Sequence, residues 1–316
     1  MVDVDHIAGT TDVSFRPNQI FAVGGLPFPI GLSTVPLNLA GVLKESLFDR
    51  IETVVVTSAT LATAGDFGFL RGRLGLNITP SPVRTEQILA SPFDFAEQCL
   101  FGVPTDLPDA RTDELGHDRA VVQAIMDLAN ASDGGMFVLF TSHGQLRRIS
   151  SAVRHAGGEG RWPLLVQGEG QRDRLLRRFR EAGNAILFGT DSFWEGVDVP
   201  GQALRVLILA KLPFKVPDEP LTAARLERLE AEGGNGFRDY LLPTAALKLK
   251  QGFGRLIRAR TDYGVIVLMD HRIVSKSYGR TLLETLPPAT QVIGPWASVR
   301  SAAEDFFARR VAGAAR

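Results

Sequence analysis

The sequence predicts an α/β fold in which a parallel sheet is flanked by helices. Short apolar runs bounded by turn residues recur along the chain, and their length and β-branched content are typical of strands buried on both faces. Segments of helical periodicity separate these runs, and the alternation favours βαβ units. We expect strands at residues 53–57, 136–141, 164–167, 185–189, 205–210 and 264–270, and helices at 39–49, 118–130, 145–155, 172–182, 221–231 and 240–258.

The first third of the chain has a different character. Residues 16–37 are rich in proline and glycine, with little periodicity, and residues 77–108 contain five prolines. One expected strand and one expected helix are too few to form a sheet. We therefore interpret residues 1–110 as a partial or accessory region and residues 111–316 as a complete α/β domain.

The composition is ordinary for a soluble globular protein, and it excludes a global attraction to polyanions. Lys and Arg together number 35, as do Asp and Glu, so any contact with nucleic acid must come from locally placed donors. The single cysteine, Cys99, excludes an internal disulfide framework and a cysteine-ligated iron–sulfur cluster within this chain. The N-terminus lacks the features of a secretory signal, and no apolar run approaches the ~20 residues that span a bilayer. We expect a cytoplasmic, reducing compartment and no membrane partner.

Small hydroxyl-bearing segments follow two of the expected strands. Ser58, Ala59 and Thr60 come directly after the first strand, where hydroxyl groups can hydrogen-bond to a neighbouring loop. Thr141 and Ser142 follow the second strand, where they could cap the next helix or hold a nucleic-acid phosphate at its N-terminus. An ordinary turn explains the first segment better, and helix capping alone explains the second.

The loop after the strand at 185–189 is rich in polar groups. Residues 188–201 read FGTDSFWEGVDVPG, with three carboxylates, two hydroxyls and glycines that permit close approach to a ligand. Ligands favour the carboxyl ends of strands in an open α/β sheet, which makes Thr190, Glu195, Gly196 and Asp198 candidate site residues. A functional loop and a structural loop are equally consistent with these residues.

A fourth segment, QGFGRLIR at residues 251–258, carries two arginines. Arg255 and Arg258 are three residues apart, so on a helix they share one face and can address one polyanion together. The planar guanidinium binds phosphate oxygens in pairs and keeps its charge. A basic helix end that interacts favourably with the helix dipole explains the same residues equally well.

In this order, the segments SATL, FTSH, GTDSFWEGVDVPG and QGFGRLIR resemble motifs III, IV, V and VI of superfamily 2 helicases, with wording closest to the DinG/XPD branch. The flanking segments SPFDF, QGEGQRDRLLRRF, KLPFKVPDEP and MDHR are also similar to DinG-type C-terminal sequence. The resemblance extends from about residue 35 to 287. It implies that the sheet is RecA-like and that residues 111–316 form the second helicase domain.

The resemblance also implies an activity and a set of roles. Such enzymes couple ATP hydrolysis to 5′ to 3′ movement along single-stranded DNA, with ATP and Mg²⁺ as cofactors. It implies that Arg255 and Arg258 are catalytic arginine fingers; that Gln251, Glu195, Gly196 and Asp198 lie at the nucleotide; that Thr141, Ser142 and Thr190 contact DNA phosphates; that Ser58, Ala59 and Thr60 couple the nucleotide state to the grip on DNA; and that Asp270 and Arg272 either brace motif VI or form a structural pair.

One departure from the family pattern decides what the chain can do alone. No G-x-x-x-x-G-K-[ST] segment and no strand-borne DExH box occur in the sequence. In this family the first RecA-like domain carries both, and residues 1–110 would hold only its tail. We therefore expect ATP and Mg²⁺ to be held mainly by a missing segment or partner, the N-terminal helicase domain in cis or in trans. No ATP hydrolysis is expected from this chain alone.

Two other functions are weighed beside the helicase half. One is a stand-alone DNA-binding or regulatory domain that has lost the motor, and the other is an inactive product of gene truncation. The basic segment 172–180 either lines a DNA path or, with about twice the weight, forms a solvated face. The acidic segment 113–117 resembles a Walker B box only superficially, and a solvated turn is expected there.

Overall fold

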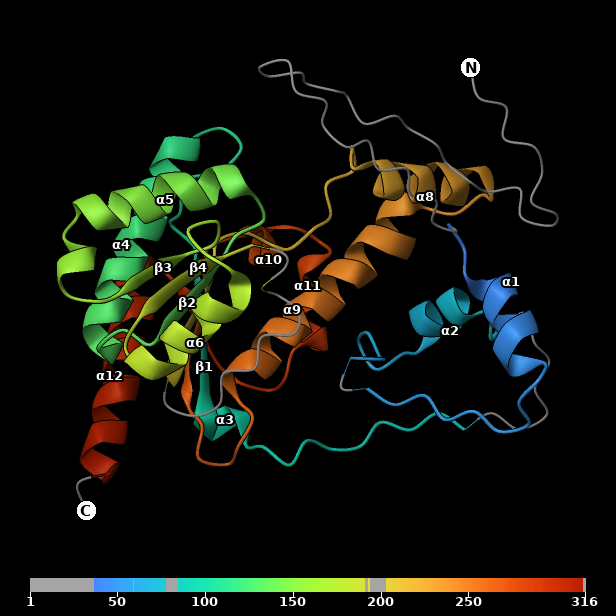
Figure 1. The fold of residues 1–316 in the computed structure, drawn as a ribbon, viewed down its shortest axis with the longest axis horizontal. Coiled ribbons are helices and arrows are strands. Elements are labelled where there is room, and N and C mark those ends of the chain that lie inside the picture. The colour runs from blue at the N-terminus through green and yellow to red at the C-terminus, as the bar shows by residue number, and fades with distance from the viewer. Residues whose placement is uncertain (1–36, 59, 78–84, 191–192, 194–202, 315–316) are drawn as a thin grey trace. The chain divides into compact units, whose positions relative to one another are not determined.

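A computed structural model describes residues 37–58, 60–77, 85–190, 193 and 203–314. The chain divides into two compact units (Figure 1). The sheet unit consists of Ile88–Phe214 and Ala245–Arg316, and the helical unit consists of Met1–Gln87 and Lys215–Thr244. The sheet unit therefore begins at Ile88, earlier than the boundary near residue 110 that the proline content suggested.

The sheet unit is built on a parallel sheet of seven strands in the order β3-β4-β2-β5-β6-β1-β7, as far as the described residues show. Every strand pair in it is parallel. The strands are β1 (Cys99–Pro104), β2 (Met136–Leu139), β3 (Leu164–Val166), β4 (Ile186–Gly189), β5 (Val206–Leu209), β6 (Gly264–Leu268) and β7 (Thr290–Gly294). This arrangement confirms the predicted parallel sheet flanked by helices.

Helices cover both faces of this sheet (Figure 1). On one face, Met136 and Val138 of β2 pack with α4, α5 and α12. On the opposite face, Phe101 of β1 packs against Phe253 of α9, with ring centroids 5.1 Å apart. The helices are α3 (Phe95–Gln98), α4 (Glu114–Ser132), α5 (His143–His155), α6 (Arg172–Ala182), α9 (Leu242–Leu256, in this unit from Ala245), α10 (Arg272–Ser275), α11 (Gly279–Thr285) and α12 (Trp296–Ala314), with a 3₁₀ turn, η2 (Gly158–Gly160).

Local capping explains where several of these helices begin. The side chains of Asp94, Asp113 and Ser142 accept a backbone N–H in the first turn of α3, α4 and α5, respectively. Such a cap satisfies one of the N–H groups that a helix start leaves without a partner. The capping by Ser142 confirms one of the two roles predicted for the FTSH segment. Asp113 corrects another expectation, because residues 113–117 begin α4 and do not form a solvated turn.

Two strands escaped the sequence analysis for local reasons. β1 contains a glycine and ends at Pro104, so its composition resembles that of a loop, yet it pairs with β6 on one side and β7 on the other. β7 is a partly exposed edge strand with polar residues, and it lacks the continuous apolar run of a central strand.

The helical unit contains α1 (Ala40–Leu43), which continues into a π-helical turn η1 (Lys44–Phe48), followed by α2 (Gly68–Leu74), α8 (Pro220–Ala231) and a second π-helical turn, η4 (Phe237–Leu241). The strand expected at residues 53–57 is absent. Those residues have no regular secondary structure, and Val55 is 83% exposed. No described strand of the helical unit lies beside them to complete a ladder.

Among the described residues, no helix has both the length and the apolar content needed to cross a bilayer.

Candidate functional site

The carboxyl ends of three neighbouring strands bring together the hydroxyl segment and two loops. β4 pairs in parallel with β2 on one side and β3 on the other. His143 begins the helix after β2, Gln167 follows β3, and Thr190 follows β4. Residues that are tens of positions apart in sequence therefore meet at one edge of the sheet.

Thr190 is the centre of this cluster. Its backbone N–H and its hydroxyl donate to Oε1 of Gln167, over 2.6 Å and 3.0 Å, and its Oγ1 lies 3.4 Å from Nε2 of His143. Only 5% of Thr190 is exposed. The Thr190 side chain therefore links the segments that follow β2, β3 and β4. Sequence analysis missed His143 and Gln167, although each stands inside a segment that it quoted.

The start of α5 forms the exposed part of the same edge. Thr141 is half-buried and Ser142 is exposed, and the Ser142 hydroxyl accepts the Gln145 N–H over 3.3 Å. The free N–H groups and the dipole of a helix N-terminus favour an anion at this position. Thr141, Ser142 and Thr190, which the resemblance had predicted together as DNA-phosphate contacts, thus lie at one edge.

Phe193, which follows β4, packs against the sheet. Its N–H donates to the Thr190 carbonyl over 2.8 Å, and its buried ring makes an edge contact with Phe137 at 6.1 Å. A Cβ on Gly189, the last residue of β4, would lie 2.8 Å from Phe193, so this position requires glycine. Of the other predicted residues in this loop, Glu195, Gly196 and Asp198 lie outside the described residues.

A buried polar network connects the start of α5 to α4 and to the end of β6. His117 is 2% exposed, and its Nε2 lies 2.8 Å from the Met269 carbonyl at the end of β6. Nε2 of Gln145 lies 3.4 Å from Nδ1 of the same ring and donates to Asp118 over 3.0 Å. Burial lowers the pKa of His117, which favours a neutral ring. The network ties α4, α5 and β6 together.

The arginine segment lies at the opposite end of the sheet. α9 ends at Leu256, and the following turn leads into the amino end of β6. In this turn the backbone N–H of Arg258 donates to Asp262 over 2.9 Å. Gln251 and Arg255 are in the last two turns of α9 and are partly exposed. Arg258 lies beyond the helix, so the prediction that Arg255 and Arg258 share one helical face is wrong.

The surroundings of Arg258 suit an anionic ligand. Burial lowers its pKa, the charge of Asp262 partly offsets this, and the charge of Arg180 lowers it further. A half-buried guanidinium near a second cation gains from an anion placed beside it. That Arg258 contacts the phosphate groups of a nucleotide stays a prediction from the sequence.

Asp270 and Arg272 form a close pair at the carboxyl end of β6. Nη2 and Nε of Arg272 donate to the carboxylate over 2.6 Å and 2.9 Å, and the Leu212 N–H donates to it over 2.9 Å. Burial raises the pKa of Asp270, but the bonds and charge of Arg272 outweigh burial and leave it below its ordinary value. The pair joins the exits of β5 and β6, at the other end of the strand from Arg258. This favours a structural pair over a brace for the arginine segment.

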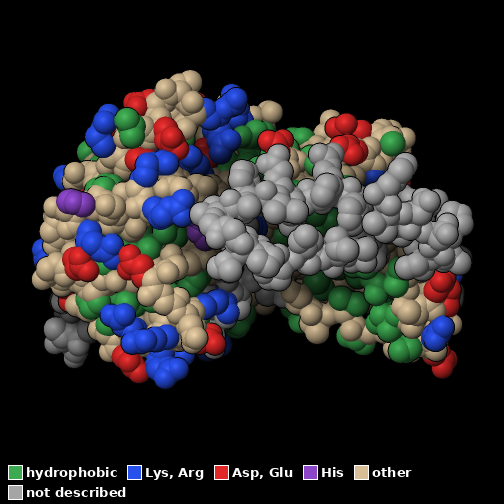
Figure 2. Space-filling model, turned by 45° about the horizontal axis from the view of Figure 1, so that its top comes forward, with side chains coloured by type: hydrophobic (Ala, Val, Ile, Leu, Met, Phe, Trp, Pro, Cys, Tyr) green, Lys and Arg blue, Asp and Glu red, His purple; other side chains and the backbone are tan. Residues whose placement is uncertain are grey.

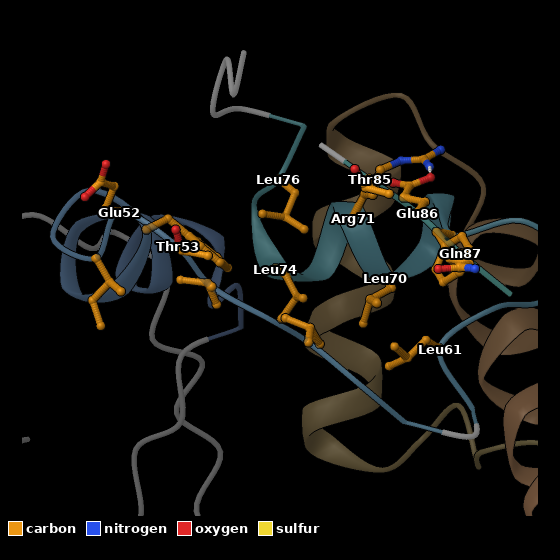
Figure 3. A pocket seen from close by; sticks show the side chains of 15 residues that line it. Glu52, Thr53, Leu61, Leu70, Arg71, Leu74, Leu76, Thr85, Glu86 and Gln87 are labelled. Atoms are coloured by element: carbon orange, nitrogen blue, oxygen red, sulfur yellow. Dashed lines mark hydrogen bonds and ion pairs between the residues drawn. The ribbon is translucent and has the colours of Figure 1, made fainter. Parts of the chain in front are cut away.

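The SATL segment belongs to the helical unit. The Ser58 hydroxyl accepts the Thr60 N–H over 3.2 Å, and both residues are at least partly exposed, whereas Ala59 lies outside the described residues. Leu61 lines a cavity of about 460 Å³ with Leu70 and Leu74 of α2 (Figure 3). An ion pair of 2.7 Å between Arg71 and Glu86 lies at its margin.

Charge and potential metal ligands are dispersed. Basic and acidic side chains are interspersed over the face shown in Figure 2, as expected from a net charge of zero. Within the described ranges, no three His, Cys, Asp or Glu side chains gather as ligands for a metal ion.

Proteins with similar sequences are helicases and related enzymes. Residues 125–289 match the family described as the helicase C-terminal domain. The ATP-dependent DNA helicase YoaA of Escherichia coli (strain K12) is 40% identical over 258 residues, which are 82% of this chain and 39% of that protein. The 3′-5′ exonuclease DinG of Bacillus subtilis (strain 168) is 37% identical over 264 residues, covering 82% of this chain and 28% of that protein. The chain thus spans well under half of each relative.

The fold has a counterpart among solved structures. Xpd4 of S. tokodaii superposes with a TM-score of 0.52 and 15% identity, covering 82% of this chain and 48% of that chain. Together with the parallel sheet, this likeness confirms the predicted RecA-like architecture.

Proposed function

Because this chain belongs to the helicase C-terminal domain family, we propose that it is the C-terminal half of an ATP-dependent 5′ to 3′ DNA helicase. In this proposal the carboxyl ends of β2, β3 and β4 contact single-stranded DNA. Arg255 and Arg258 serve a nucleotide site that an N-terminal helicase segment completes, in cis or in trans.

The cluster of Thr190, Gln167 and His143 is the observation that carries the DNA contact. It holds three loops together beside the N-terminus of α5, where exposed N–H and hydroxyl donors face solvent. Such donors bind phosphate oxygens without reading base sequence. DNA held there would follow the carboxyl edge of the sheet, and the chain's net charge of zero makes these local donors necessary.

The nucleotide contribution follows from the arginines at the amino end of β6. ATP, when bound, supplies the phosphoryl group whose transfer to water drives translocation. Arg255 and Arg258 would bind its phosphate oxygens, and in phosphoryl-transfer enzymes an arginine in this role raises the rate ~10³-fold or more. Glu195, Gly196 and Asp198 would complete the nucleotide-facing loop, and Mg²⁺ would be held by the N-terminal segment.

DNA binding tests the first part of the proposal. A labelled single-stranded oligothymidylate should bind the full chain with an affinity that falls as salt rises. Gln167→Ala should weaken binding about tenfold, because the loops lose their common acceptor. Gln123→Ala is the matched control, since that exposed glutamine on α4 bonds only to Asp127 among the described residues. Equal affinities for the two variants would argue against this DNA site.

Hydrolysis tests the second part. The chain alone should not hydrolyse ATP, and mixing it with a P-loop-bearing N-terminal helicase segment should produce DNA-stimulated hydrolysis that Arg255→Ala abolishes. Robust hydrolysis by the single chain that Arg255→Ala abolishes would contradict the proposal. DNA binding by the chain without any hydrolysis in the mixture would favour the alternative, a stand-alone DNA-binding module.

A further inference from the structure

Three cations lie near one tyrosine in the helical unit, away from the site residues described above. Two guanidinium groups lie over the ring of Tyr240, which belongs to η4. That of Arg73 in α2 is 5.8 Å from the ring centroid, and that of Arg225 in α8 is 5.7 Å from it. Arg225 also donates to the tyrosine hydroxyl over 2.8 Å. Lys215 is close enough for its charge to act on the same hydroxyl.

The cluster has an excess of positive charge. None of these three cations forms an ion pair with a carboxylate in the part of the chain that the structure describes. Burial raises the pKa of the Tyr240 hydroxyl, but the bond from Arg225 and the three positive charges outweigh burial and bring that pKa below its ordinary value. Like charges held this close repel one another, and an anion among them would remove the repulsion.

The donors in the cluster are not all used. Nε of Arg225 is buried and has no hydrogen-bond partner among the described residues. The Tyr240 hydroxyl accepts from Arg225, so its own hydrogen can be donated to a ligand. Arg73 is exposed, and Lys215 and Arg225 are half-buried, which leaves the cations accessible to solvent. Several N–H donors and one O–H donor around a positive centre match the oxygens of a phosphate group.

We propose that Arg73, Lys215, Arg225 and the Tyr240 hydroxyl form a phosphate-binding site, and that it holds a backbone phosphate of single-stranded DNA. The DNA part rests on the proposed function. The phosphate part rests on the cluster itself. A free polyphosphate has the same chemistry, and the experiment separates the two sources.

Binding of labelled oligothymidylate to the full chain, over a range of NaCl concentrations, tests the DNA source. Arg73→Gln should weaken binding about tenfold and reduce the slope of log affinity against log salt by about 0.7, the effect of one lost phosphate contact on a single strand. Tyr240→Phe keeps the ring and should weaken binding about threefold. Arg228→Gln is the control, because Arg228 lies one turn from Arg225 on α8 but pairs with Glu232.

Thermal unfolding with inorganic tripolyphosphate tests the phosphate site independently of DNA. The wild-type Tm should rise with tripolyphosphate, and the rise should be lost in Arg73→Gln but kept in Arg228→Gln. A rise of this kind without any change in DNA affinity would assign the site to free polyphosphate and overturn its role in DNA binding. If the wild type binds no DNA, the proposed function fails, and the tripolyphosphate result alone decides the site. Equal behaviour of Arg73→Gln and wild type in both measurements would overturn it entirely.

Discussion

Of two apolar runs rich in β-branched residues, one forms a buried strand and the other forms no strand. Residues 206–209 (VLIL) form β5, fully buried between β2 and β6. Residues 53–57 (TVVVT) are one residue longer and entirely β-branched, yet they form no strand, and Val56 is 45% exposed. The difference lies in the neighbours, since a strand needs backbone partners on at least one side and side chains to pack against. The sheet unit provides both for β5. Residues 53–57 pair with no described strand, and only Val54 among them is half-buried.

The sharpest test of this comparison truncates one side chain in each run. Ile208→Ala should cost about 3 kcal/mol of unfolding free energy, because it leaves a cavity in the core. Val55→Ala should change it by less than about 0.5 kcal/mol, since its side chain is already in water. Urea unfolding of the full chain followed by circular dichroism measures both. A cost for Val55→Ala comparable to that for Ile208→Ala would show that the exposed run is buried in solution.

The ion pair of Asp270 and Arg272, at the carboxyl end of β6, should give the next largest effect. Asp270→Asn removes the charge that pairs with Arg272 and should cost about 2 kcal/mol, because the guanidinium stays half-buried without its counter-charge. Glu284→Gln, which breaks an exposed pair with Arg280 one turn away, should cost less than about 0.5 kcal/mol. Denaturant midpoints compare the two. Similar costs would mean that burial adds nothing to the Asp270 pair.

Acid should weaken the sheet unit through His117. Its pKa in the folded chain is lowered by burial, so below an unfolded pKa of about 6.5 the unfolded chain binds more protons than the folded one. The contribution of His117 to the unfolding free energy is therefore fully present above that pH. It falls as pH drops, with a slope of at most about 1.4 kcal/mol per pH unit for this one group. His117→Gln should flatten the dependence between pH 7 and 5, read from unfolding midpoints. An unchanged slope would exclude His117 as its source. Asp270 adds a loss only at lower pH, because its folded pKa is also lowered and its contribution disappears as pH falls through that value.

The smallest effect concerns a glycine that the fold does not need. Gly254 lies in α9, and no described atom comes within 4 Å of a Cβ built there. Gly254→Ala should stabilise the chain by about 0.5–1 kcal/mol through helix propensity. Gly102 is the contrasting position, since a Cβ there would lie 2.5 Å from Val299, and the same change should destabilise. A loss of DNA-stimulated hydrolysis when the stabilised Gly254→Ala protein is mixed with the N-terminal helicase segment would show that α9 needs close approach by a ligand or partner there.

Much of the sheet unit could be predicted from local pattern. The runs that became β2 to β6 were each expected within two residues of their observed ends, and α6 was expected at its observed bounds. The candidate site was predicted in part. The hydroxyl segment and Thr190 were named, but Gln167 and His143 were missed, because their roles depend on β2, β3 and β4 being neighbours. That adjacency is not encoded in any one segment.

By itself the sequence determined the α/β class, the main strands and helices, and, through the order of four motifs, the helicase family. These properties depend on side-chain periodicity and residue type along short stretches, which the chain carries whatever it packs against. The tertiary structure decided that β1 and β7 complete the sheet, that Arg258 leaves its helix and lies at the end of the sheet opposite Thr190, and that residues 53–57 form no strand. Each of these depends on which distant segments become neighbours, because a strand or a site exists only where its partners are brought beside it.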